Sequence, residues 1–98
     1  MTRRANIHSL AELEPNEAIE YYEEASPGLG AAFLSVIEQS VRSIIEYPEA
    51  TPLARGTVRK RVVRRFPYPV LYRVTPDSIR ILAIMNLKRR PFYWRGRR

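Results

Sequence analysis

The sequence predicts a single α+β domain in which an antiparallel helical hairpin packs on one face of a small antiparallel sheet. In the first half, two stretches carry apolar residues at three- and four-residue spacing, which is typical of amphipathic helices. In the second half, three short runs rich in β-branched and aromatic residues are separated by turns. With 98 residues, the chain is long enough for one domain, residues 1–98, and too short for two.

The first half begins with a weakly alternating segment, residues 5–11, which predicts a short strand at the edge of the sheet. Pro15 suits the first turn of a helix, so the first helix is predicted over residues 15–25. The break at residues 26–28 leads to a longer helix over residues 29–47. The apolar stripe predicted to form the core of this hairpin comprises Ile19, Tyr22, Phe33, Ile37, Val41 and Ile44.

The second half supplies the sheet. Strands are predicted over residues 59–66, 70–75 and 79–87, the last of them apolar enough to lie centrally. Short connections between them indicate an antiparallel meander, which completes a β-α-α-β-β-β order with the strand at the N-terminus. Residues 88–98 form a basic, aromatic tail.

Charge is segregated along the chain. Residues 1–50 contain nine acidic and three basic side chains, whereas residues 51–98 contain one acidic and fourteen basic side chains. A half with a net charge of +13 attracts polyanions such as nucleic acid, a nucleoprotein or an acidic protein segment. The alternative is a solvated basic face that serves solubility alone.

Composition excludes several classes of function. The chain has no cysteine and one histidine, His8, so it has neither disulfides nor a cysteine or histidine metal site, and we expect no metal and no cofactor. No apolar run approaches the roughly 20 residues that cross a bilayer, and Arg3-Arg4 is not followed by an apolar stretch. We therefore expect a cytoplasmic protein that does not bind membranes.

Several short motifs follow one another along the chain: Tyr21-Tyr22-Glu23, Pro27-Gly28-Leu29-Gly30 with Phe33, Pro48, Arg65-Phe66-Pro67-Tyr68, residues 70–74, residues 81–84, Arg89-Arg90-Pro91 and Tyr93-Trp94. This ordered set resembles the RelE/ParE toxin superfamily, and more closely its ParE branch. The resemblance implies a helical hairpin on an antiparallel sheet and a type II toxin that is neutralised by a cognate antitoxin in a hetero-oligomer. It also implies one of two targets, namely DNA gyrase for ParE-like members or mRNA in the ribosomal A site for RelE-like members.

Departures from the nuclease pattern favour the gyrase-binding alternative. Where RelE-like nucleases begin a strand with arginine, this chain has Pro69, which cannot bind phosphate. For an endoribonuclease, the candidate catalytic residues would be Lys60, Arg64, Arg90 and Tyr93. Asn86 stands where many ParE-like members have histidine, and its role stays open.

The predicted target- and antitoxin-binding residues are basic and aromatic: Arg64, Arg65, Phe66, Tyr68, Arg73, Arg89, Arg90, Tyr93, Trp94 and Arg95. Phe66 and Tyr68 have a second interpretation, as anchors of the connection between two strands. Trp94, surrounded by arginines near the end of the chain, is interpreted as a partner contact. A third hypothesis is that the whole protein is a non-toxic module that only sequesters a partner.

Overall fold

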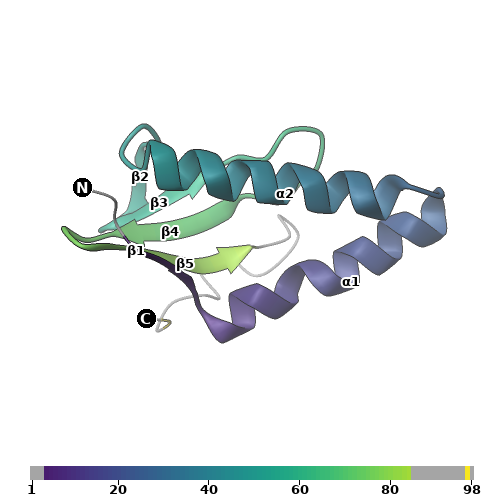
Figure 1. The fold of residues 1–98 in the computed structure, drawn as a ribbon, viewed down its shortest axis with the longest axis horizontal. Coiled ribbons are helices and arrows are strands. Elements are labelled where there is room, and N and C mark those ends of the chain that lie inside the picture. The colour runs from purple at the N-terminus through teal and green to yellow at the C-terminus, as the bar shows by residue number, and fades with distance from the viewer. Residues whose placement is uncertain (1–3, 85–96, 98) are drawn as a thin grey trace.

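The computed structural model describes residues 4–84 and Arg97, and it confirms the α+β fold. Within these residues, two helices and five strands follow one another (Figure 1): β1 Arg4–Ile7, α1 Ser9–Ala25, α2 Leu29–Glu46, β2 Leu53–Arg55, β3 Val58–Arg61, β4 Val70–Val74 and β5 Ser78–Ile84. The two helices form the predicted antiparallel hairpin, and the turn between them lies well away from the strands (Figure 1). Neither helix is long and apolar enough to cross a membrane.

Helix α1 begins six residues earlier than predicted. His8 caps it, because its Nδ1 atom accepts a hydrogen bond of 3.1 Å from the backbone N–H of Leu10. Pro15 therefore lies inside the helix, where it leaves the carbonyl of Ala11 without its usual N–H donor. Its ring is buried, so apolar burial offsets part of that loss.

The turn between the helices depends on two glycines. Gly28 adopts a left-handed conformation with φ +86°, which glycine tolerates best, and it begins α2. At Gly30, an added Cβ atom would lie 2.6 Å from the carbonyl oxygen of Ile19 on α1, so only glycine permits this approach of the helices. The Glu23 carboxylate accepts hydrogen bonds from the N–H groups of both glycines, at 2.9 and 3.0 Å.

The sheet has the order β1-β5-β4-β3-β2 and is mixed, because β1 pairs in parallel with β5 while all other pairs are antiparallel. The strand predicted over residues 5–11 is present at the sheet edge as β1, although residues 9–11 belong to α1, and β5 lies inside the sheet as predicted, between β1 and β4. Strand β1 stops at Ile7, and the N–H of His8 donates to the carbonyl of Ile81. Weak alternation of polarity indicates an extended segment but not its direction, so the parallel pair was not predicted.

The region from residue 53 to residue 69 differs most from the prediction. Strand β2 was not predicted, since its three residues are all exposed and show no alternation. Strand β3 ends at Arg61 rather than at residue 66, and Arg65 has a positive φ of 74°. The chain leaves the sheet after β3, and Val63 and Phe66 enter the core.

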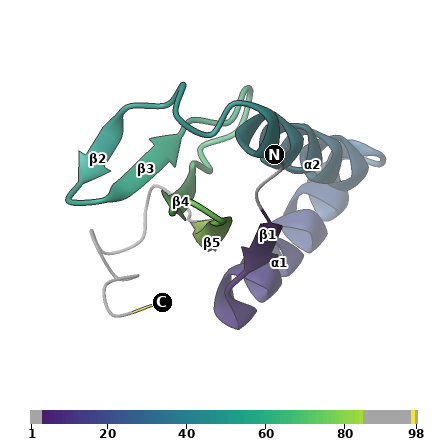
Figure 2. The same ribbon diagram turned by 60° about the vertical axis from the view of Figure 1, so that its left-hand side comes forward.

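The core lies mainly between the helices and one face of the sheet, and Figure 2 shows both helices on that side. The largest fully buried side chains of the described residues are those of Tyr72, Phe33 and Ile44, and the hydroxyl of Tyr72 donates to the carbonyl of Pro48 at 2.8 Å. A smaller buried cluster occupies the opposite face of the sheet and comprises Val58, Leu71, Leu82 and Ala83.

Candidate functional site

The basic side chains of β3 and β4 divide between the two faces of the sheet. Because paired residues share a face, Lys60 lies beside Leu71, and Arg73 lies beside Val58, on the face away from the helices. Arg80 of β5 is directly opposite Arg73 on the same face. We refer to Lys60, Arg73 and Arg80 as the basic sheet face.

Two further arginines of β3 point to the helix side and hold the fold together. Arg61 donates to the hydroxyls of Thr51 and Ser43 at 2.8 and 2.9 Å. Arg59 donates to the carbonyl of Thr51. These bonds hold α2 and the connection after it against β3, so the two guanidinium groups mainly stabilise the fold.

Arg64 and Arg65 border a groove of about 310 Å³ between α2 and the end of β3. This α2 groove is lined by Val36, Gln39, Ser40, Ser43, Arg61, Val62, Arg64 and Arg65. Val62 is 68% exposed, although it is apolar. The groove therefore combines hydroxyl groups, two exposed cations and an exposed aliphatic side chain.

Phe66 and Tyr68 lie in an aromatic cluster under the helical hairpin rather than on the surface of the sheet. The ring centroid of Phe66 is 4.9 Å from that of Tyr22 and 5.0 Å from that of Phe33. Tyr68 is half-buried and lies 5.0 Å from Phe33. Burial raises the pKa of Tyr22 above its ordinary value of 10.0, and the neighbouring Tyr68 and Tyr21 raise it further.

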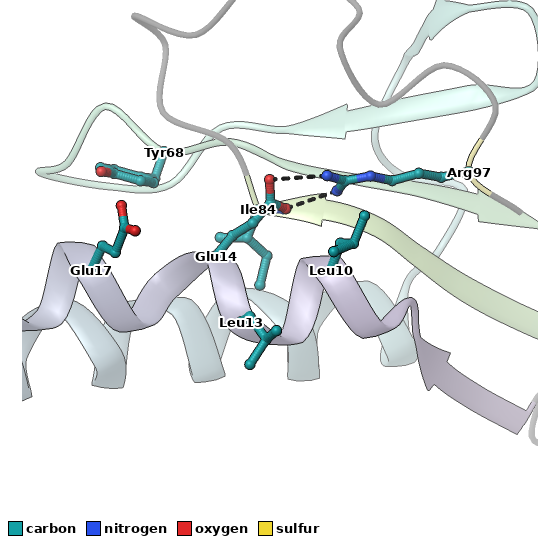
Figure 3. Close-up of a pocket in the computed structure, with 7 residues that line it drawn as sticks. All are labelled: Leu10, Leu13, Glu14, Glu17, Tyr68, Ile84 and Arg97. Atoms are coloured by element: carbon teal, nitrogen blue, oxygen red, sulfur yellow. Dashed lines mark hydrogen bonds and ion pairs between the residues drawn. The ribbon is translucent and has the colours of Figure 1, made fainter.

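A second hollow, of about 320 Å³, lies between the first half of α1 and the end of β5 (Figure 3). Its described lining residues are Leu10, Leu13, Glu14, Glu17, Tyr68, Ile84 and Arg97. Glu14 and Arg97 form an ion pair of 3.0 Å, and both side chains are almost buried. The same Glu14 oxygen accepts the N–H of Ile84 at 3.0 Å, and Arg97 also donates to the carbonyl of Leu82 at 2.9 Å.

The structure thus distributes the predicted site residues over several places. Arg64 and Arg65 meet at the α2 groove, while Lys60 and Arg73 lie on the basic sheet face. Phe66 and Tyr68 belong to the aromatic cluster, which is consistent with their interpretation as anchors of the connection between two strands. Asn86 and the remaining predicted site residues lie outside the described part of the chain. Those site residues are Arg89, Arg90, Tyr93, Trp94 and Arg95.

Two features were not predicted from the sequence: the Glu14–Arg97 ion pair, and the hydrogen bonds that Ser43 and Thr51 accept from Arg61. Glu14 had a detectable signal, because it falls within the α1 stripe of Ala11, Pro15 and Ala18 that faces the core. A carboxylate on such a stripe requires a partner.

The basic sheet face and the α2 groove carry positive charges, which attract anions. Lys60 and His8 belong to strands β3 and the end of β1, which are three strand spacings apart, or about 14 Å. His8 therefore cannot exchange a proton at a phosphate held by Lys60. Within residues 4–84 and Arg97, no three acidic or histidine side chains are grouped as metal ligands.

Comparison with known proteins gives consistent results. Residues 6–91 match the family model described as the ParE toxin of the type II toxin–antitoxin system parDE. The chain is 31% identical over 87 residues to the toxin ParE2 of two Mycobacterium tuberculosis strains, which covers 88% of this chain and 83% of the relative. A solved structure of the chromosomal ParDE system from P. aeruginosa shares the fold, with a TM-score of 0.76, 18% identity, and coverage of 87% of this chain and 96% of that one.

Proposed function

This chain belongs to the ParE toxin family of type II toxin–antitoxin systems, and we propose that it stops growth by binding and poisoning DNA gyrase until a cognate antitoxin neutralises it. Because DNA gyrase acts on the chromosome, the proposed function is carried out in the cytoplasm. The antitoxin forms a hetero-oligomer with the toxin.

The residue immediately before β4 favours target binding over RNA cleavage. Pro69 stands there with its side chain fully buried, so the position offers neither a cation for a phosphate nor a proton donor. On the basic sheet face, the side chains of Lys60 and Arg73 lie beside the apolar residues Leu71 and Val58, and Arg80 donates to the Asn6 amide oxygen at 2.7 Å. Such a surface is suited to holding an acidic or nucleoprotein partner by charge.

The proposal is tested with purified toxin and DNA gyrase. We expect the toxin to inhibit supercoiling or to trap cleaved DNA, and we expect its expression without antitoxin to arrest growth and to induce a DNA-damage response. Addition of the purified antitoxin should reverse the inhibition. Cleavage of mRNA in the ribosomal A site, with gyrase unaffected, would instead establish the endoribonuclease alternative.

A charge-reversal pair locates the target surface. Lys60→Glu on the basic sheet face should weaken gyrase inhibition, because it replaces one of the cations that attract an acidic partner with an anion. Arg42→Glu changes the charge equally at an exposed position of α2 and should leave inhibition near that of the wild type. Equal effects of the two variants would show that only net charge matters and that the basic sheet face is not the contact surface.

A further inference from the structure

The α2 groove presents an unusual combination of an exposed apolar side chain and exposed cations. Val62 has 68% of its surface exposed, and Val36 lies on the opposite wall. Single exposed apolar side chains are common, but one that borders a groove and is flanked by arginines has the form of an anchor position.

The cations of this groove are available to a ligand. Arg64 and Arg65 are exposed, and neither forms an ion pair with any residue in the described ranges 4–84 and 97. Arg61, which lines the same groove, is occupied by the hydroxyls of Ser43 and Thr51. The groove therefore has two positive charges that no carboxylate of the described residues neutralises.

The backbone of Arg65 provides an independent indication. Its φ of +74° lies in the left-handed region, which costs a residue with a side chain about 1 kcal/mol or more. The guanidinium carbon lies 5.5 Å from the centroid of the Phe66 ring, so a cation–π contact with the aromatic cluster holds it beside the groove. Strained residues of this kind concentrate where a ligand is bound.

We propose that the α2 groove is a docking site for an acidic segment of the antitoxin. Carboxylates of that segment pair with Arg64 and Arg65, and an apolar side chain next to them packs between Val36 and Val62. The hydroxyl of Ser40 and the amide of Gln39 lie on the same wall and can hydrogen-bond its backbone. This inference rests on the proposed function, since it names a contact surface for the antitoxin.

Charge complementarity and shape both favour a peptide over nucleic acid. A nucleic acid backbone needs a row of cations, as on the basic sheet face, and gains little from an aliphatic side chain. The α2 groove instead alternates aliphatic, hydroxyl and guanidinium groups over a volume that accommodates a few side chains. An extended or helical segment with alternating acidic and apolar residues matches this pattern.

The first test measures the affinity of the purified antitoxin, the product of the neighbouring gene, for full-length toxin variants. The double variant Arg64→Glu/Arg65→Glu should raise the Kd about 100-fold at low salt, because like charges then face each other. Val62→Ser should raise it about tenfold. Matched controls are Arg42→Glu, an exposed arginine on another side of α2, and Leu53→Ser, a leucine that is 58% exposed on β2. Both controls should bind as the wild type does.

The second test separates binding from folding. Arg65→Gly relieves the backbone conformation and removes the guanidinium, so it should weaken antitoxin binding about tenfold while the Tm stays within about 4 °C, the shift that 1 kcal/mol produces. A purely structural role for Arg65 predicts the opposite result, a lower Tm with unchanged affinity.

Several outcomes overturn the inference. Antitoxin affinity that is unchanged in the double variant, or equally reduced in Arg42→Glu, excludes the α2 groove as the docking site. If the double variant loses binding of a DNA oligonucleotide but keeps that of the antitoxin, the groove binds nucleic acid instead. Gyrase inhibition by the free wild-type toxin is measured separately, so failure of the proposed function is distinguished from failure of this inference.

Discussion

Glu14 is a carboxylate on the side of α1 that faces the sheet. Strand β1 pairs with β5 only as far as Ile81, so among residues 4–84 no strand lies beside that edge of β5 beyond Ile81. Glu14 accepts the N–H of Ile84, and Arg97 donates to the carbonyl of Leu82. The pair thus satisfies backbone groups of β5 that β1 does not reach, which explains why two charged groups are kept almost out of water.

Substitution of Glu14 tests this role. Glu14→Leu should lower the free energy of unfolding by about 3 kcal/mol, because it removes the acceptor of the Ile84 N–H and the carboxylate that pairs with the Arg97 guanidinium. Urea denaturation measures the effect. Glu17→Leu is the control, since Glu17 lines the same hollow but is exposed, and it should change stability by less than about 0.5 kcal/mol. Similar losses in both variants would contradict the edge-pairing role.

Tyr22 provides a prediction about pH. Burial, followed by the neighbouring Tyr68 and Tyr21, raises its pKa above 10.0, so the folded protein releases this proton at higher pH than the unfolded chain. The associated stability is fully present below about pH 10 and is lost as the pH rises through the folded pKa. In urea titrations, Tyr22→Phe should therefore lose less stability than the wild type between about pH 9 and 11, a range centred on the ordinary tyrosine pKa of about 10. Parallel curves would show that other groups determine the alkaline transition.

Among the elements, the two helices illustrate how close packing depends on one residue. Helix α1 turns small residues toward the core, Ala11 and Ala18, while Leu10 and Leu13 are exposed. Helix α2 supplies most of the large side chains of the hairpin core, including Phe33, Ile37 and Ile44. The helices approach most closely where Gly30 faces the backbone of α1.

Gly30→Ala should separate the helices at this point. The added methyl group would lie 2.6 Å from the carbonyl oxygen of Ile19, which is backbone and cannot move without shifting α1. We expect a loss of about 1–3 kcal/mol in the free energy of unfolding. Gly28→Asn is a matched control in open space, because asparagine tolerates the left-handed conformation, and it should cost less than about 1 kcal/mol. Thermal and urea unfolding compare the two variants, and a tolerated Gly30→Ala would show that the hairpin can spread without loss.

At the scale of the whole molecule, the segregation of charge determines how the protein behaves alone and in complex. The acidic side chains concentrate on α1, where there are six glutamates and no basic residue, and the basic ones on the sheet and the segments around it. Arg73 and Arg80 are directly opposite across β4 and β5. Like charges in this arrangement destabilise a sheet.

Salt should therefore have opposite effects on the free toxin and on its complex. Raising NaCl from about 0.05 to 0.5 M shortens the screening length severalfold, which should raise the Tm of the free toxin by a few degrees and weaken its affinity for the antitoxin. Differential scanning fluorimetry and calorimetric titration measure the two effects. Lys60→Gln removes one charge from the basic sheet face and should reduce the rise in Tm. A Tm that falls with salt would show that ion pairs outweigh repulsion.

The periodicity of the sequence by itself determined the order of the elements other than β2, the helical hairpin, the interior position of β5 and most of the core. It did so because helical and strand periodicities are local, and burial of Phe33, Ile37 and Ile44 follows from their spacing. The ordered motifs also indicated the toxin family, which the comparisons confirm.

Tertiary structure alone decided the parallel pairing of β1, the end of β3 at Arg61 and the division of the arginines among different surfaces. Each of these depends on contacts between residues far apart in the chain. The direction of β1 is set by bonds to Asp77 and Ile81. Arg59 and Arg61 are bound to Thr51 and Ser43, whereas Arg64 and Arg65 form no ion pair within the described residues. A count of charges identifies a basic half, but only the folded chain shows which cations remain available to a partner.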